Sequence, residues 1–125
     1  MQPFLLVFVG SGLGGMLRYA VNLAAGALLG MAFPWGTAFV NVAGSFTMGV
    51  VAGVLAIKGA GFDGWRLFLA TGILGGFTTF SSFSLDTATL WERGATAAAG
   101  AYVLGSVVLS IAALFAGLWL TRAVL

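Results

Sequence analysis

Four long apolar runs, separated by short turns, restrict the folds that are open to this sequence. Each run exceeds the roughly 20 apolar residues that a helix needs to cross the hydrocarbon core of a bilayer. Of the 125 residues, 61% are hydrophobic and 6% are charged, a composition typical of an integral membrane protein. We therefore predict an all-α membrane protein with a single four-helix transmembrane domain over residues 1–125, and with spans of about 3–29, 35–57, 66–91 and 95–121.

The third run contains a stretch that does not suit a lipid-facing helix, residues 75–84, with the sequence GGFTTFSSFS. Glycine weakens a helix, and the five hydroxyl groups between Thr78 and Ser84 offer the backbone other hydrogen-bond partners. Backbone that leaves the helical form at membrane depth is tolerated only where it is buried in protein or lines a wet cavity. We therefore predict a break in the third helix near residues 75–79, with an ion or substrate beside it.

A break of this kind offers binding groups of both signs. The half-helix that ends at the break presents carbonyl oxygens, which suit a cation, and the half-helix that restarts presents N–H groups, which suit an anion. Phe80 and Phe83 are three residues apart and share a helix face. A phenyl ring can offer its positive edge to an anion or its negative face to a cation. Ordinary packing is the alternative role for such a pair, although packing does not explain the neighbouring glycines and hydroxyls.

Polar side chains at a spacing of four residues form stripes on two of the other runs. The second run carries Thr37, Asn41 and Ser45, and the fourth carries Tyr102, Ser106 and Ser110. Asn41 can either join helices by a hydrogen bond or line a pore. The stripes are rich in donors and hold no carboxylate, and this favours an anion over a cation. Asp86 is the only acid inside a run, and it suits either a pathway or the membrane boundary.

The first run holds one charge, Arg18, within a series of small or polar residues spaced by four: Gly10, Gly14, Arg18, Asn22 and Gly26. The glycines permit close contact with another helix. An arginine in hydrocarbon is costly, so Arg18 faces a partner, a wet vestibule or the interface. Snorkelling to the far boundary and an electropositive pore mouth are both open.

Three motifs together resemble the bacterial Fluc (CrcB) fluoride channels. They are Gly15-x-x-Arg18-Tyr19 in the first run, Gly36-Thr37-x-x-Val40-Asn41-x-x-Gly44-Ser45-Phe46 in the second, and Gly75-Gly76-Phe77-Thr78-Thr79-Phe80-Ser81 in the third. The resemblance covers all four runs in order, and its third motif is the most specific. It implies an antiparallel, dual-topology homodimer with two fluoride pores and a structural sodium ion, Na⁺, at the two-fold axis.

The resemblance also implies roles for individual residues. The fluoride pore is expected to include Phe80, Phe83, Asn41, Thr79, Ser81, Tyr102, Ser106 and Ser110. Arg18 is expected at the vestibule, and the backbone carbonyls of Gly75 and Thr78 are expected to hold the sodium ion. The family often has Glu in the later part of the third helix, where this chain has Asp86. The shorter side chain leaves the contact of Asp86 open.

The function implied by the resemblance is passive fluoride efflux through the bacterial inner membrane, which lowers cytoplasmic fluoride. A small four-helix multidrug exporter is the first alternative, but it needs an intramembrane carboxylate and the first run has none. A non-transporting membrane scaffold is the second, and it does not explain the donor stripes. An enzyme is not expected, because the chain has no His or Cys and no paired acids within a run. The net charge of +2 gives no indication of a nucleic-acid partner.

The positive charges predict insertion in both orientations. With four spans, the side of the amino terminus carries Lys58, Arg66 and Arg122, while the other side carries Arg93 and Arg18. Orientation follows the bias in Lys and Arg between the two sides, and three against two is almost no bias. No inverted repeat is visible within the chain, so pseudo-symmetry of the transporter kind has to come from pairing two copies.

Overall fold

Helices make up most of the computed structural model, which describes residues 2–59 and 61–125. The elements are α1 (Gln2–Leu29), α2 (Trp35–Lys58), α3 (Asp63–Trp65), the π-helix η1 (Arg66–Leu74), α4 (Gly75–Phe77), α5 (Phe80–Glu92) and α6 (Thr96–Val124). Four helical stretches are long and apolar enough to cross a membrane: Gln2–Leu29, Trp35–Lys58, Asp63–Glu92 and Thr96–Val124. The prediction of an all-α protein with four such helices is confirmed.

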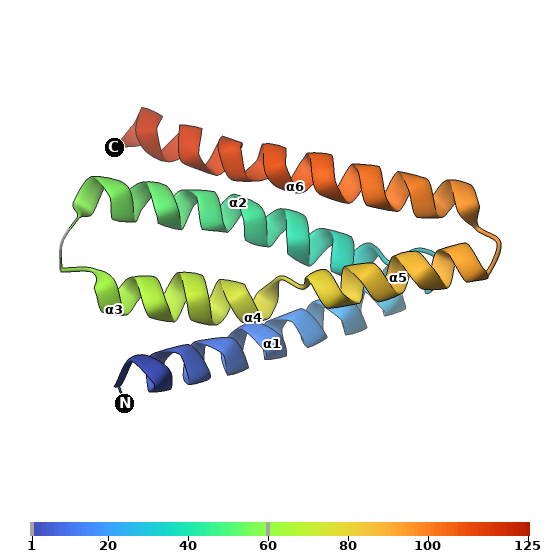
Figure 1. The fold of residues 1–125 in the computed structure, drawn as a ribbon, viewed down its shortest axis with the longest axis horizontal. Coiled ribbons are helices and arrows are strands. Elements are labelled where there is room, and N and C mark those ends of the chain that lie inside the picture. The colour runs from blue at the N-terminus through green and yellow to red at the C-terminus, as the bar shows by residue number, and fades with distance from the viewer. Residues whose placement is uncertain (1, 60) are drawn as a thin grey trace.

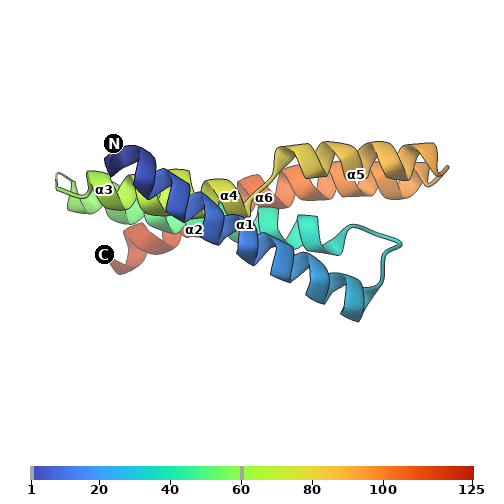
Figure 2. The same ribbon diagram turned by 90° about the horizontal axis from the view of Figure 1, so that it is seen from below.

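The four stretches run up and down along one long axis, as Figure 1 shows. Both chain ends and the turn between α2 and α3 lie at one end of the bundle, and the other two turns lie at the opposite end. The α2 helix packs along α6, and α1 packs against η1 and α4. Figure 2 shows α5 lying beside α6 and directed away from the second half of α1. The third stretch therefore changes its neighbours along its length.

Glycines allow the closest helix contacts. A Cβ atom on Gly10 would lie 2.7 Å from the Phe68 carbonyl oxygen of η1, and one on Gly14 would overlap the Ile73 carbonyl oxygen. Between helices α2 and α6, a Cβ on Gly117 of α6 would lie 2.9 Å from the Val50 nitrogen of α2. Helices in membranes associate largely through such close packing of small residues. Gly10 and Gly14, four residues apart on one face of α1, thus allow α1 to pack closely against η1.

The third stretch has the least regular backbone. The nine residues of η1 form a π-helix, and α4 follows directly and ends at Phe77. Thr78 (φ −82°, ψ 156°) and Thr79 (φ −152°, ψ 120°) are extended, and α5 begins at Phe80. Figure 2 shows the chain as a thin link between α4 and α5. We call the two extended residues, Thr78 and Thr79, the junction.

The buried core is small, because most large apolar side chains point outward. Val40 and Tyr102 are the largest fully buried side chains, and Tyr102 forms a cluster with Leu90 and Ala99. Phe4, for comparison, is 81% exposed. An exposed apolar surface of this extent suits a chain surrounded by lipid.

The close contact between α2 and α6 predicts a cost for even one methyl group. Gly117→Ala should lower the free energy of unfolding in detergent micelles by about 1–3 kcal/mol, because the added Cβ overlaps the α2 backbone. The matched control is Gly100→Ala on the same helix, where a Cβ meets nothing within 4 Å. Alanine favours a helix over glycine, so the control should be neutral or stabilising. Equal stability of the two variants would contradict the packing described here.

Candidate functional site

An open groove of about 240 Å³ lies where α2, α5 and α6 meet beside the junction. Its lining residues are Asn41, Ser45, Thr78, Thr79, Phe80, Phe83, Ser106, Val107 and Ser110. We call it the central groove. It brings together six of the eight residues predicted for the pore, together with Thr78 from the predicted sodium site. Among the described residues, those that line it include amide, hydroxyl and phenyl groups but no carboxylate.

Asn41 pairs with the junction through both ends of its side-chain amide. The Thr79 backbone N–H donates to Asn41 Oδ1 at 2.8 Å, and Asn41 Nδ2 donates to the Thr79 carbonyl oxygen at 3.1 Å. This is the pattern by which one strand residue pairs with another, so the amide replaces a missing backbone neighbour. An asparagine NH₂ carries two donors. One N–H of Asn41 is therefore left over at the lining of the central groove.

The hydroxyls of the junction bond to backbone groups on both of its sides, and the Leu74 carbonyl accepts from the Thr78 N–H at 3.0 Å as well. Thr78 Oγ1 donates to the Leu74 carbonyl oxygen at 2.9 Å. Thr79 is the N-cap of α5, and its Oγ1 accepts from the Ser82 N–H at 3.1 Å. A threonine in this position stabilises a helix start by about 1 kcal/mol. Ser81 lies outside the central groove, with its Oγ 3.3 Å from Thr79 Oγ1.

The two phenylalanines of α5 differ in their surroundings. Their ring centroids are 5.6 Å apart, with an angle of 53° between the ring planes. Phe80 is 77% exposed, whereas Phe83 is half-buried and packs against Tyr102 at 5.1 Å. The contact with Tyr102 thus holds the Phe83 ring in place, whereas the Phe80 ring is largely exposed.

The serines of α6 supply a further donor to the central groove. Ser106 is buried, and the Oγ of Ser110 is buried without a hydrogen-bond partner among the described residues. A buried hydroxyl without a partner costs about 1–3 kcal/mol. A ligand in the central groove that accepts a hydrogen bond from Ser110 would recover this cost.

Tyr102 lies beside the central groove and does not line it. Its hydroxyl donates to Asp86 Oδ2 at 3.1 Å, and the side chain is 1% exposed. This pair could not be predicted from the sequence, because the two residues lie on different helices, α5 and α6. Asp86 itself lines a second hollow, of about 300 Å³, which includes Asn22 and Arg93 and lies next to the turn between α1 and α2.

Arg18 contacts the end of α4. Its Nε donates to the Gly76 carbonyl oxygen at 3.1 Å, across 58 residues of sequence. The carbonyl end of a helix favours a cation, so the guanidinium completes the last turn before the junction. Its expected place at a vestibule stays a prediction.

The pairing of Asn41 also affects Gly75. In a continuous helix the Thr79 N–H would bond to the Gly75 carbonyl, but it is donated to Asn41 instead. Gly75 thereby loses its usual backbone donor, and its carbonyl is left for another partner. The Thr78 carbonyl belongs to the extended junction. These two carbonyls are chemically suited to a hard cation, as the sequence predicted for sodium.

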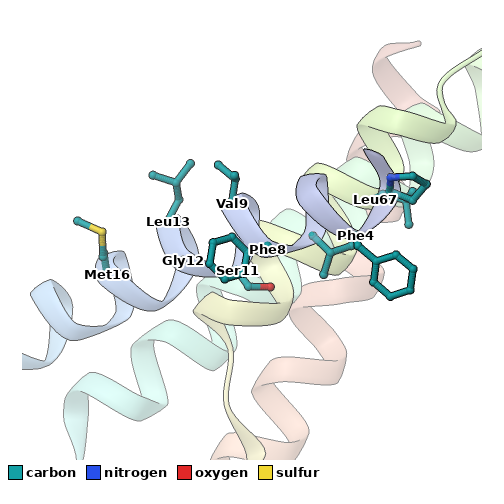
Figure 3. Close-up of a pocket in the computed structure, with 10 residues that line it drawn as sticks. Phe4, Phe8, Val9, Ser11, Gly12, Leu13, Met16 and Leu67 are labelled. Carbon is teal, nitrogen blue, oxygen red and sulfur yellow. The ribbon is translucent and has the colours of Figure 1, made fainter. Parts of the chain in front are cut away.

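A larger groove, with a volume of about 1020 Å³, lies elsewhere, along the outer face of α1. Figure 3 shows Phe4, Phe8, Leu13 and Met16 among its lining side chains. The lining is almost entirely apolar and carries no charged side chain among the described residues. Such a surface suits lipid or another helix and gives an anion no donor.

Comparisons with known proteins bear on this site. A protein-family profile described as "CrcB-like protein, Camphor Resistance (CrcB)" matches residues 5–118. A protein of Rhodopseudomonas palustris (strain BisB5), named "Fluoride-specific ion channel FluC", is 60% identical over 98% of this chain and 99% of its own length. A protein of Chelativorans sp. (strain BNC1) with the same name is 58% identical over the full length of both chains. Both matches extend over the part of the chain that contains the central groove.

Proposed function

Because this chain belongs to the CrcB family, we propose that it is a fluoride-selective ion channel through which fluoride leaves the cytoplasm passively. The observation that carries the proposal is the central groove, in which neutral donors and phenyl edges meet without a carboxylate. The curated relatives are named as fluoride-specific channels at 58–60% identity. We accordingly propose an ion channel and not an enzyme.

Each part of the central groove has a use for a small anion. Fluoride is strongly hydrated, so its loss of water has to be offset by donors. The remaining N–H of Asn41 and the unpartnered hydroxyl of Ser110 are donors of this kind. The positive edges of Phe80 and Phe83 can face the anion. A carboxylate in this position would repel it.

The direction of flow follows from the membrane potential. Acid outside the cell lets neutral HF enter, and the neutral cytoplasm retains the proton-free anion. A potential of about 100 mV, negative inside, drives each anion outward with about 2.3 kcal/mol. A passive pore in the inner membrane of a bacterium therefore lowers cytoplasmic fluoride without an energy source of its own.

The alternative functions fit the geometry less well. A proton-coupled drug exporter needs a carboxylate in its pathway within the membrane, whereas Asp86 lines the second hollow and not the central groove. A scaffold protein explains the glycine contacts but not the Ser110 hydroxyl, which has no partner in the described part of the chain. Neither alternative accounts for the donors gathered in the central groove.

Fluoride efflux from liposomes tests the proposed pore. Phe80→Ile keeps the bulk of the side chain and removes the ring edge, and Asn41→Asp places a negative charge beside the anion. At about 4 Å and an effective dielectric constant near 20, this repulsion is roughly 4 kcal/mol, or about a thousandfold in rate. Efflux should fall strongly in both variants.

The control for this experiment is Thr47→Val, because Thr47 is exposed on α2 and bonds only within its own helix. It should conduct like the unaltered protein. Fluoride efflux at the normal rate in both Phe80→Ile and Asn41→Asp would rule out the central groove as the pathway.

We further propose that the third helix is broken at the junction within the membrane and that two copies form an antiparallel, dual-topology homodimer. The extended dihedral angles of Thr78 and Thr79 support the break. Both termini lie at one end of the bundle (Figure 1). Counted by position in the sequence, the positive charges divide three to two between the two sides, although Arg18 contacts Gly76 next to the junction. The exposed apolar groove of α1 (Figure 3) offers a surface for a second copy.

Dual topology predicts that a tag at the carboxyl terminus is accessible from both faces of the membrane in comparable amounts. The reason is the near absence of a positive-inside bias. Two lysines added to the turn between Lys58 and Arg66 should favour one orientation and reduce fluoride efflux when that variant is expressed alone. A tag found on one face only would exclude insertion in both orientations.

The sodium site is also a proposal. The residues fit it, because the pairing of Asn41 with Thr79 removes the usual backbone donor of the Gly75 carbonyl, and the Thr78 carbonyl, three residues later, belongs to the extended junction. With a second copy at a two-fold axis, four such carbonyls would form a neutral oxygen cage, which suits a monovalent hard cation such as Na⁺. Its charge would stabilise the pairing and attract anions.

Replacing all sodium with a large organic cation should weaken the dimer and reduce fluoride efflux. Potassium-free sodium buffer serves as the reference condition. Unchanged dimerisation and unchanged efflux after the replacement would count against the site.

A further inference from the structure

A row of aromatic rings connects the turn between α1 and α2 to the central groove. Trp35 and Phe33 have ring centroids 4.6 Å apart, and Phe33 meets Tyr102 edge-on at 5.5 Å, with 89° between the ring planes. Tyr102 packs against Phe83 at 5.1 Å, and Phe83 against Phe80 at 5.6 Å. All these separations lie in the range of favourable aromatic contacts. Phe33, in the turn between α1 and α2, is thus connected through the Tyr102 ring to Phe83, which lines the central groove.

Tyr102 transmits this contact because it is held on several sides. Its side chain is 1% exposed, and its hydroxyl is bonded to Asp86 on the same helix as Phe83. Leu90 and Ala99 complete the buried cluster, against which Phe33 and Phe83 both pack. Protein interiors are close-packed, so a void on one side of a ring is felt by its neighbours. Removing Phe33 would open such a void directly behind Tyr102.

Arg93 fixes the turn that carries Phe33. Arg93 follows the last residue of α5, and its Nη2 donates to the Ala32 carbonyl oxygen across 61 residues of sequence. No carboxylate forms a salt bridge with Arg93 in the described part of the chain. The guanidinium therefore acts on the residue directly before Phe33. The other hydrogen bonds of this turn are local, such as the one from the Trp35 N–H to the Phe33 carbonyl at 2.9 Å.

We infer that Arg93 and Phe33 are positioning residues for the fluoride pathway: Arg93 fixes the turn, the turn presses Phe33 on Tyr102, and Tyr102 holds the ring of Phe83 at the central groove. Neither residue lines that groove. The inference rests on the proposed function only in the efflux test, which requires that the protein conducts fluoride. The position of the Phe83 ring can be measured whether or not the protein conducts fluoride.

The first test measures the ring directly. We would replace Phe83 by 4-fluorophenylalanine and record its ¹⁹F NMR signal in detergent micelles without fluoride. Phe33→Ala and Arg93→Ala should both shift or broaden the signal. Phe39→Ala is the matched control, since Phe39 is 59% exposed on α2, and it should leave the signal unchanged. An unchanged signal in both Phe33→Ala and Arg93→Ala would overturn the inference.

The second test is a double-mutant cycle on fluoride efflux from liposomes. Loss of one aromatic contact corresponds to about a tenfold effect, and we expect a decrease of this order for Phe33→Ala and for Arg93→Ala. Because the two residues act through one turn, the double variant should be hardly slower than either single variant. Independent effects that multiply to about a hundredfold would contradict the shared route.

Charge and folding are controlled by further variants. Arg93→Lys keeps the charge and a hydrogen-bond donor and should retain most of the efflux. Phe33→Ala changes no charge and so leaves membrane orientation unaffected. If Phe33→Ala does not fold, Phe33→Leu takes its place in both tests. A changed ¹⁹F signal in a protein that conducts no fluoride would keep the positioning role and refute the proposed function, which separates the two failures.

Discussion

The pairing of the Asn41 side chain with the Thr79 backbone is the interaction on which the rest of the site depends. Two extended residues in an apolar helix leave backbone groups without helical partners, and each such group is costly at membrane depth. Asn41 satisfies both the N–H and the carbonyl of Thr79. Arg18 donates to the Gly76 carbonyl. The hydroxyls of the two junction threonines bond to the Leu74 carbonyl and to the Ser82 N–H. The junction is therefore stable in a chain that has few polar side chains.

The same pairing separates the chemistry on its two sides. Toward α4, it withdraws the Thr79 N–H from Gly75 and leaves carbonyl oxygen for a cation. Toward α5, the helix restarts with its N–H groups and the aromatic pair Phe80 and Phe83 near the central groove. The proposed anion site and the proposed cation site would thus lie a few residues apart, and neither would need an ionised side chain.

Much of this arrangement could be predicted from the sequence, because it depends on local patterns. The apolar runs gave the four helices, and the stripes at a spacing of four gave the residues of α2 and α6 that meet in the central groove. The pairs that were missed join residues far apart in the chain: Tyr102 with Asp86, Arg18 with Gly76, and Arg93 with Ala32. Periodicity places a residue on a helix face but does not say which face of another helix it meets. The π-helical form of η1 was likewise not foreseen, since no simple residue pattern specifies it.

The most direct measurement of the central claim is an NMR titration of the Asn41 side-chain amide, labelled with ¹⁵N in micelles. One amide proton is bonded to the Thr79 carbonyl and should keep its chemical shift. The other is left for the anion and should shift as fluoride is added, while chloride at the same concentration has no such effect. If fluoride shifts neither proton, or if chloride shifts the free proton equally, then Asn41 is not the donor that links the junction to a fluoride pathway.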